Sequence, residues 1–264
     1  MVHTIRYEVE NVIGSGAQGN IVAAFDHKKK QQVAIKIYNK PEPFRREQKA
    51  FKLLSKKKVA QVCEISKWSR NNNGKIVVMK RYKSDLFDYV TERDLLSKTL
   101  SKKLFKQMCL IIRDIHNAGI AHLDLKLENF LVDENDNPVL TDFGSCFIQN
   151  KKRRSIFSKK SNPLQSLKLR GTVNYAAPEL FSNPECKNMI DPFVADIYSV
   201  GVILHVLETG HFPETDLKFA KENLSSDCYS LLCSLLSNNP NERYSMDEIL
   251  VHPWLSMKQI EPVN

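Results

Sequence analysis

Short apolar runs separated by polar turns mark much of the first eighty residues of the chain. Two apolar runs surround a glycine-rich turn in VENVIGSGAQGNIVAAFD, and QVAIKIY follows as a third run. KIVVM comes after the NNNG turn at 71–74. These runs have the composition and length of strands. Between them, Phe44, Glu47, Phe51 and Leu54 repeat at helical spacing. The pattern predicts a small strand-rich region with one main helix.

After Arg81 the apolar positions follow a helical period. Residues 101–118 place five large apolar side chains on one stripe, and Gly119 ends this helix. Residues 194–208 are apolar almost all round, which is typical of a buried central helix. SMDE at 245–248 is a capping box that opens a last helix. We therefore predict an α+β fold of two lobes: a small β-rich lobe over about 7–80, a hinge at about 80–83, and a mainly helical lobe over about 84–255.

Composition narrows the class of protein. The chain has 264 residues, of which 42% are hydrophobic, so it can bury a large core. Six cysteines are scattered without a CxxC pair, which favours reduced thiols and an intracellular protein, cytoplasmic or nuclear. MVHTIRYEVE has no apolar run, so we expect no secretory signal. The longest apolar run, Val200 to Leu207, is too short to cross a bilayer, and we expect no membrane association.

The net charge of +9 is local. Eight basic residues and no acidic residue lie between Phe143 and Pro178, and removing those eight from the 39 basic residues leaves 31 against 30 acidic ones. A general nucleic-acid-binding face is therefore not indicated. Within this span, KKRRSIF at 151–157 is open to three interpretations: a solvated loop insertion, a phosphorylation site at Ser155, or a nuclear-import patch.

The glycine-rich turn has the spacing G-x-G-x-x-G at Gly14, Gly16 and Gly19. Dinucleotide-binding folds use the same spacing, but there the third glycine opens a helix. Here NIVAAF is apolar and β-branched, so a strand returns and the loop is a hairpin. Glycines in such a loop let backbone amides approach phosphate oxygens, although an ordinary turn has the same spacing.

Chemistry-bearing residues follow in order along the chain. In VAIK, Ala34 and Lys36 face the same side of a strand, where Ala34 leaves room for a flat base and Lys36 can reach phosphates. Glu47 on the next helix is the candidate partner of Lys36, and the alternative is a solvated strand lysine.

The stretch IAHLDLKLENF carries three further candidates. Asp124 can accept a proton from a substrate hydroxyl, and Lys126 can neutralise a transferred phosphoryl group. Asn129 offers an oxygen ligand suited to Mg²⁺, and Asp142 in TDFG is the second metal ligand.

Taken together, these motifs resemble those of the eukaryotic protein kinases over residues 7–255, with 256–264 as a short tail. The matches are GSGAQG, VAIK, Glu47, HLDLKLEN, DFG, AAPE, DIYSVG and Arg243, in that order. The resemblance implies a two-lobed enzyme that uses ATP and Mg²⁺ and phosphorylates proteins. Lys126 together with Thr172 in GTVNYAAPE resembles the serine/threonine type.

The resemblance also implies roles by position. It places the nucleotide against Gly14, Ser15, Gly16, Ala17, Gln18, Gly19, Ile21, Ala34, Lys36, Met79, Lys80, Tyr82, Asp85 and Leu131. It makes Lys36, Glu47, Asp124 and Lys126 catalytic, and Asn129 and Asp142 metal ligands. Phe51, Ile65, His122 and Phe143 would form a hydrophobic spine between the lobes, and Glu179 would pair with Arg243.

Two departures from the kinase pattern concern regulation. Leu123 stands where relatives have an arginine that binds a phosphate on the activation segment. Counting back from Gly171 and Thr172, the usual phosphorylated position falls on Lys168, with Ser166 the nearest alternative acceptor. The chain therefore lacks both the phosphate-binding arginine and the residue that would be phosphorylated. We predict an active kinase that is not switched by phosphorylation at this position.

The sequence also bears on the phosphate-binding loop, the substrate and an alternative function. Gln18 replaces an aromatic residue at the loop tip, which we expect to loosen the lid over the phosphates. Asp85 and Glu128 weakly favour a basic protein substrate. The alternative function is that of a pseudokinase, a nucleotide-binding scaffold without catalysis, and the oligomeric state is not indicated.

Overall fold

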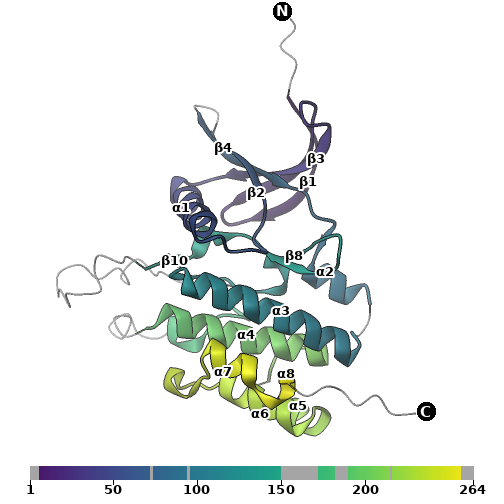
Figure 1. Cartoon of the computed structure of the whole chain (residues 1–264), viewed down its shortest axis with the longest axis vertical. Helices are drawn as coiled ribbons and strands as arrows, with labels where there is room; N and C mark the ends of the chain where they lie inside the picture. The colour runs from purple at the N-terminus through teal and green to yellow at the C-terminus, as the bar shows by residue number, and fades with distance from the viewer. Residues whose placement is uncertain are drawn as a thin grey trace, which may run out of the picture.

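The computed structural model describes residues 6–71, 74–93, 96–149, 172–181, 190–214 and 216–256. A five-stranded sheet and one helix form a small lobe, and a larger, mainly helical lobe lies beneath it (Figure 1). The predicted α+β, two-lobed fold is confirmed.

The sheet of the small lobe is antiparallel throughout. Its strands are β1 (Tyr7–Gly16), β2 (Gly19–Asp26), β3 (Gln31–Tyr38), β4 (Ile65–Asn71) and β5 (Gly74–Lys80), in the order β1-β2-β3-β5-β4. The sequence pattern does not predict β4. Its sequence, ISKWSRN, has large apolar side chains only at Ile65 and Trp68 and no period-two alternation. The pairing with β5 also shifts register between Ile65 and Lys67.

Helix α1 (Pro41–Lys57) covers the sheet and carries one face of buried residues. The predicted helical spacing is confirmed, because Phe44, Glu47, Phe51 and Leu54 are all buried on one face of the helix. The helix ends where Lys58 adopts a left-handed conformation and donates its backbone N–H to the carbonyls of Leu54 and Ser55.

The large lobe begins after the hinge. Its elements are β6 (Ser84–Asp85), α2 (Leu86–Thr91), α3 (Lys98–Asn117), β7 (Ile120–Ala121), η1 (Leu127–Asn129), β8 (Phe130–Val132), β9 (Pro138–Leu140), η2 (Phe143–Ser145), β10 (Phe147–Ile148), η5 (Pro178–Phe181), α4 (Pro192–Thr209), α5 (Lys218–Asn223), α6 (Ser226–Leu235), η7 (Pro240–Glu242), α7 (Met246–Val251) and α8 (Pro253–Ser256). The capping box at Ser245 and Glu248 is confirmed, but α7, which it opens, is not the last helix because Pro253 starts α8.

Helix α4 lies at the centre of the large lobe, beside α3 (Figure 1). It is apolar on all sides because it is packed on all sides. By length and composition alone it could cross a membrane, but 78% of it is buried inside the protein, as in a core helix. Four polar side chains of α4 are also buried, and one of them, Asp196, accepts the backbone N–H groups of His122 and Leu123.

Candidate active site

A cavity of about 770 Å³ lies between the two lobes. It is lined by all fourteen residues predicted to contact nucleotide and by Asp124, Lys126, Asn129 and Asp142. Glu47 is the one predicted site residue that does not line it, because it lies behind Lys36. The structure adds Ile13, Ser84, Thr141 and Ser145 to the wall, none of which sequence analysis had singled out.

The glycine-rich turn is a β-hairpin, as predicted. Gly16 pairs with Gly19 across the tip, with Ala17 and Gln18 between them. Gly19 has φ +152°, and a Cβ atom there would lie 1.8 Å from the backbone oxygen of Ile37 on β3. Only glycine fits this position, because β2 and β3 approach too closely for a side chain.

Gln18 reaches from the hairpin tip to the opposite wall of the cavity. Its Nε2 donates to Ser145 Oγ at 3.2 Å. Its amide also lies on the backbone of Gly144, where an added Cβ would be 1.7 Å from Gln18 Oε1. Gln18 therefore ties the hairpin to the turn after Asp142 in this structure, and a looser lid stays a prediction.

Lys36 is the centre of a buried charge cluster. Its Nζ lies 3.0 Å from Glu47 Oε2 and 2.8 Å from Asp142 Oδ1. Burial alone would lower the pKa of the Lys36 ammonium, but the two carboxylates together raise it above its ordinary value. Lys36 is therefore a fixed positive charge on the cavity wall, and the interpretation as a solvated strand lysine is excluded by its 4% exposure.

Asp142 lies at a sharp turn between β9 and η2. Its backbone is left-handed, with φ 58°, and its side chain accepts the N–H of Gly144 at 3.2 Å. Burial would raise the pKa of this carboxyl, but Lys36 lowers it below its ordinary value. A quarter of the Asp142 side chain remains exposed, so an ionised carboxylate faces the cavity.

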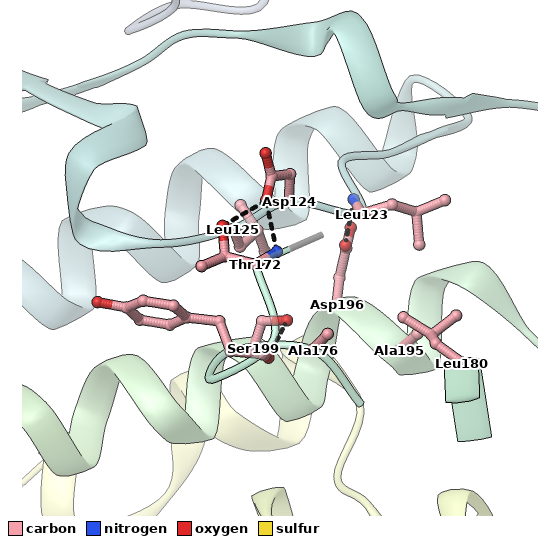
Figure 2. Close-up of a pocket in the computed structure, with 10 residues that line it drawn as sticks. Leu123, Asp124, Leu125, Thr172, Ala176, Leu180, Ala195, Asp196 and Ser199 are labelled. Carbon is pink, nitrogen blue, oxygen red and sulfur yellow. Dashed lines mark hydrogen bonds between the residues drawn. The ribbon is translucent and has the colours of Figure 1, made fainter. Parts of the chain in front are cut away.

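Asp124 and Asn129 are held by the backbone of their own loop and by Thr172. The N–H and the hydroxyl of Thr172 both donate to Asp124 Oδ1, at 3.0 and 3.1 Å (Figure 2). Asn129 donates its amide nitrogen to the backbone oxygen of Asp124 at 2.7 Å. This arrangement leaves two oxygen atoms that can accept a hydrogen bond or bind a cation. They are the second carboxylate oxygen of Asp124 and the amide oxygen of Asn129.

Leu123 is turned away from the cavity. Its backbone is left-handed, with φ 61°, and its N–H donates to Asp196 Oδ1 at 2.7 Å (Figure 2). His122 N donates to the other oxygen of Asp196, also at 2.7 Å. The Leu123 side chain is 4% exposed and packs in an apolar cluster with Ala121, Ala177, Leu180 and Ala195. The place of a phosphate-binding arginine is thus a hydrophobic core.

Two structural contacts expected from the motifs are present. Phe143 stacks edge-on against Phe51 of α1 and against His122, with ring centroids 5.2 and 5.0 Å apart, so apolar packing joins the two lobes. Arg243 binds Glu179 with both terminal nitrogens, at 2.7 and 2.8 Å. Ser155, Ser166 and Lys168 lie outside the described residues.

Comparison with known proteins agrees with this geometry. The family model described as "Protein kinase domain" matches residues 7–255. Testis-specific serine/threonine-protein kinase 3 of Mus musculus is 32% identical over 275 residues, which cover 95% of this chain and 96% of the relative. CBL-interacting protein kinase 5 of Oryza sativa subsp. japonica is 31% identical over 94% of this chain and 55% of its own length. The chain belongs to the protein kinase family, and the mouse relative, which it matches over most of its length, is a serine/threonine-protein kinase.

Proposed function

We propose that this protein transfers the γ-phosphoryl group of ATP to serine and threonine hydroxyls of protein substrates. The observation that carries the proposal is the Lys36 cluster. One lysine contacts Glu47 and Asp142 at 3.0 and 2.8 Å on the wall of the same cavity that Asp124 lines. Positive charge for phosphate and an oriented carboxylate for a hydroxyl are what phosphoryl transfer requires.

Different residues of the chain would bind the phosphates, bind the base and orient the substrate hydroxyl. Lys36 holds phosphate oxygens, and the lining residues Ala34 and Met79 leave an apolar slot for the base. Asp124, fixed by Thr172, orients the substrate hydroxyl and accepts its proton. Lys126 faces the cavity and neutralises developing charge.

Asn129 and Asp142 fit a magnesium ion. Asp142 is an ionised carboxylate. The amide nitrogen of Asn129 donates to the backbone oxygen of Asp124, so its amide oxygen takes no part in that bond. Each residue therefore offers an oxygen to a hard cation. Bound magnesium would neutralise phosphate charge and hold the phosphates in place.

Regulation and substrate preference complete the proposal. Leu123 lies in an apolar cluster, so this position offers no cation to a phosphorylated activation segment. Activity is then constitutive or set by partners. Asp85, Asp88 and Glu128 of the large lobe line the cavity, and their negative charge favours basic residues in the protein substrate.

The test is a transfer assay with labelled ATP, magnesium, a generic basic protein and a peptide library. We expect transfer to serine and threonine, lowered at least ~10²-fold by Lys36→Met and by Asp124→Asn. Lys52→Met, which removes an exposed lysine of α1, is the matched control and should retain activity. Thermal melting of each variant checks folding. ATP binding without any transfer by the wild-type protein would identify a pseudokinase instead.

A further inference from the structure

Glu47 has a second partner besides Lys36. The hydroxyl of Tyr38 donates to Glu47 Oε2 at 2.7 Å, and Lys36 Nζ lies 3.0 Å from the same oxygen. All three side chains are buried: Glu47 is 1% exposed, Lys36 4% and Tyr38 6%. A buried hydrogen bond to a charged group is among the stronger polar contacts in proteins.

The position of Tyr38 follows from the geometry of β3. Residues two apart on a strand face the same side, so Tyr38 lies beside Lys36, with Lys36 Nζ 5.0 Å from the centre of its ring. The ring also packs edge-on against Phe44 of α1 at 5.3 Å, and Phe44 packs against Trp68 of β4 at 5.4 Å. Tyr38 is thus held by both the sheet and the helix that carries Glu47.

The connection between β3 and α1 is very short. Only Asn39 and Lys40 separate Tyr38 from Pro41, and two residues span roughly 7 Å at most. The N–H of Asn39 donates to the carbonyl of Gln18 at 3.0 Å, which ties the connection to the glycine-rich hairpin. Helix α1 therefore has little freedom to rotate away from the sheet at its N-terminal end.

The hydroxyl of Tyr38 keeps its proton. Burial, followed by the charge of Glu47, raises the pKa of this phenol far above its ordinary value. It therefore remains a hydrogen-bond donor to Glu47 wherever the protein is folded.

We propose that Tyr38 is a positioning residue for phosphoryl transfer, which fixes Glu47 in contact with Lys36 without a partner protein or a phosphorylated activation segment. The inference rests on the proposed function. It explains how a chain with Leu123 in an apolar cluster keeps its lysine–glutamate pair assembled. In this account the tyrosine hydroxyl and the two-residue connection together hold Glu47 in place.

The test is Tyr38→Phe, which removes the hydroxyl and keeps the ring packed against Phe44. We expect kcat to fall at least five-fold while the KM for ATP changes less than two-fold. Tyr7→Phe is the matched control, because Tyr7 lies in the same lobe as Tyr38. The hydroxyl of Tyr7 is buried but has no hydrogen-bond partner among the described residues. This variant should behave like the wild-type protein. Unchanged kcat in Tyr38→Phe would overturn the proposal.

A double-mutant cycle separates positioning from packing. In a Glu47→Gln background, Tyr38→Phe should have less than a two-fold further effect, because its hydroxyl acts through Glu47. Effects that multiply in full would mean that Tyr38 acts by another route and would overturn the proposal.

Hydrogen exchange decides the proposal independently of activity. Amides of α1 around Glu47 should exchange at least five-fold faster in Tyr38→Phe than in the wild-type protein, with α3 unchanged. Equal protection of α1 in both proteins would overturn the proposal. Absence of phosphoryl transfer by the wild-type protein would instead contradict the proposed function, and this exchange measurement would still decide whether Tyr38 holds α1.

Discussion

At the scale of single residues, Leu123 connects the sequence of the catalytic loop to its regulation. The loop holds Leu123 in a left-handed conformation, which costs a non-glycine residue about 1–2 kcal/mol. Two hydrogen bonds from the backbone to Asp196 and the burial of the leucine side chain offset this cost. The position therefore has a structural role in this chain, because the residues around it form an apolar site that fits a leucine side chain.

Restoring arginine at this position should destabilise the protein. In Leu123→Arg a charged side chain would enter a cluster of Ala121, Ala177, Leu180 and Ala195 with no acidic partner among the residues of that cluster. An unpaired buried charge costs about 3–5 kcal/mol. We expect the melting temperature to fall by on the order of 10 °C in differential scanning fluorimetry.

Leu123→Met is the control for this substitution. A volume-conserving apolar exchange costs less than about 1.5 kcal/mol, so this variant should melt within a few degrees of the wild-type protein. If Leu123→Arg were as stable as Leu123→Met, the guanidinium would have to reach solvent or an anion, and the apolar cluster would not be the reason for the leucine.

At the scale of elements, the hairpin of β1 and β2 is anchored at its open end by an ion pair. Asp26 is fully buried and accepts Nε and Nη2 of Arg6 at 3.2 and 3.0 Å. It also accepts the backbone N–H groups of Lys28 and Lys29. The hydrogen bond from Arg6 is the largest influence on the Asp26 carboxyl. Together with the backbone hydrogen bonds it lowers the pKa of this carboxyl below its ordinary value, although burial acts to raise it.

This anchor should make stability depend on pH in a defined direction. The pKa of Asp26 is lowered in the folded state, so its contribution is present above the unfolded value of about 3.9 and is lost as the pH falls through the folded value. Asp26→Asn should therefore lower the free energy of unfolding at pH 7. The difference from the wild-type protein should shrink below about pH 4.

Urea unfolding of both proteins between pH 3 and pH 7 measures this. Asp114→Asn, which removes a half-exposed partner of Arg113, is the control and should have little effect at any pH. A constant difference between Asp26→Asn and wild type across the whole range would show that the charge of Asp26 does not carry the effect.

How well each element could be predicted depends on its local pattern. Helices α1, α3 and α4 follow from apolar stripes or uniform apolarity, and the glycine hairpin follows from the β-branched residues after it. β4 was missed because its pattern is not periodic. The site residues could be named from their motifs, but Tyr38 could not, because a tyrosine at the end of a strand is an ordinary strand residue. Gln18 and Ser145 are 127 positions apart, and only the fold brings them together.

At the scale of the whole molecule, side chains of the two lobes contact each other at several points. Phe51, Phe143 and His122 stack from α1 into the large lobe. Arg46 Nη1 donates to the carbonyl of Gly144 at 2.6 Å, and Gln18 reaches Ser145. Lys36 contacts both Glu47 and Asp142 in the same structure. Packing and hydrogen bonds between the chain's own side chains therefore join the two lobes around the Lys36 cluster.

We propose that this kinase is active without a phosphorylated activation segment. The most direct measurement is the initial rate of phosphoryl transfer before and after phosphatase treatment, with the phosphorylation state checked by mass spectrometry before and after the assay. We expect the rates of the two preparations to lie within two-fold of each other. A drop of ten-fold or more on dephosphorylation, about 1.4 kcal/mol in barrier, reproduced by Ser166→Ala, would contradict it.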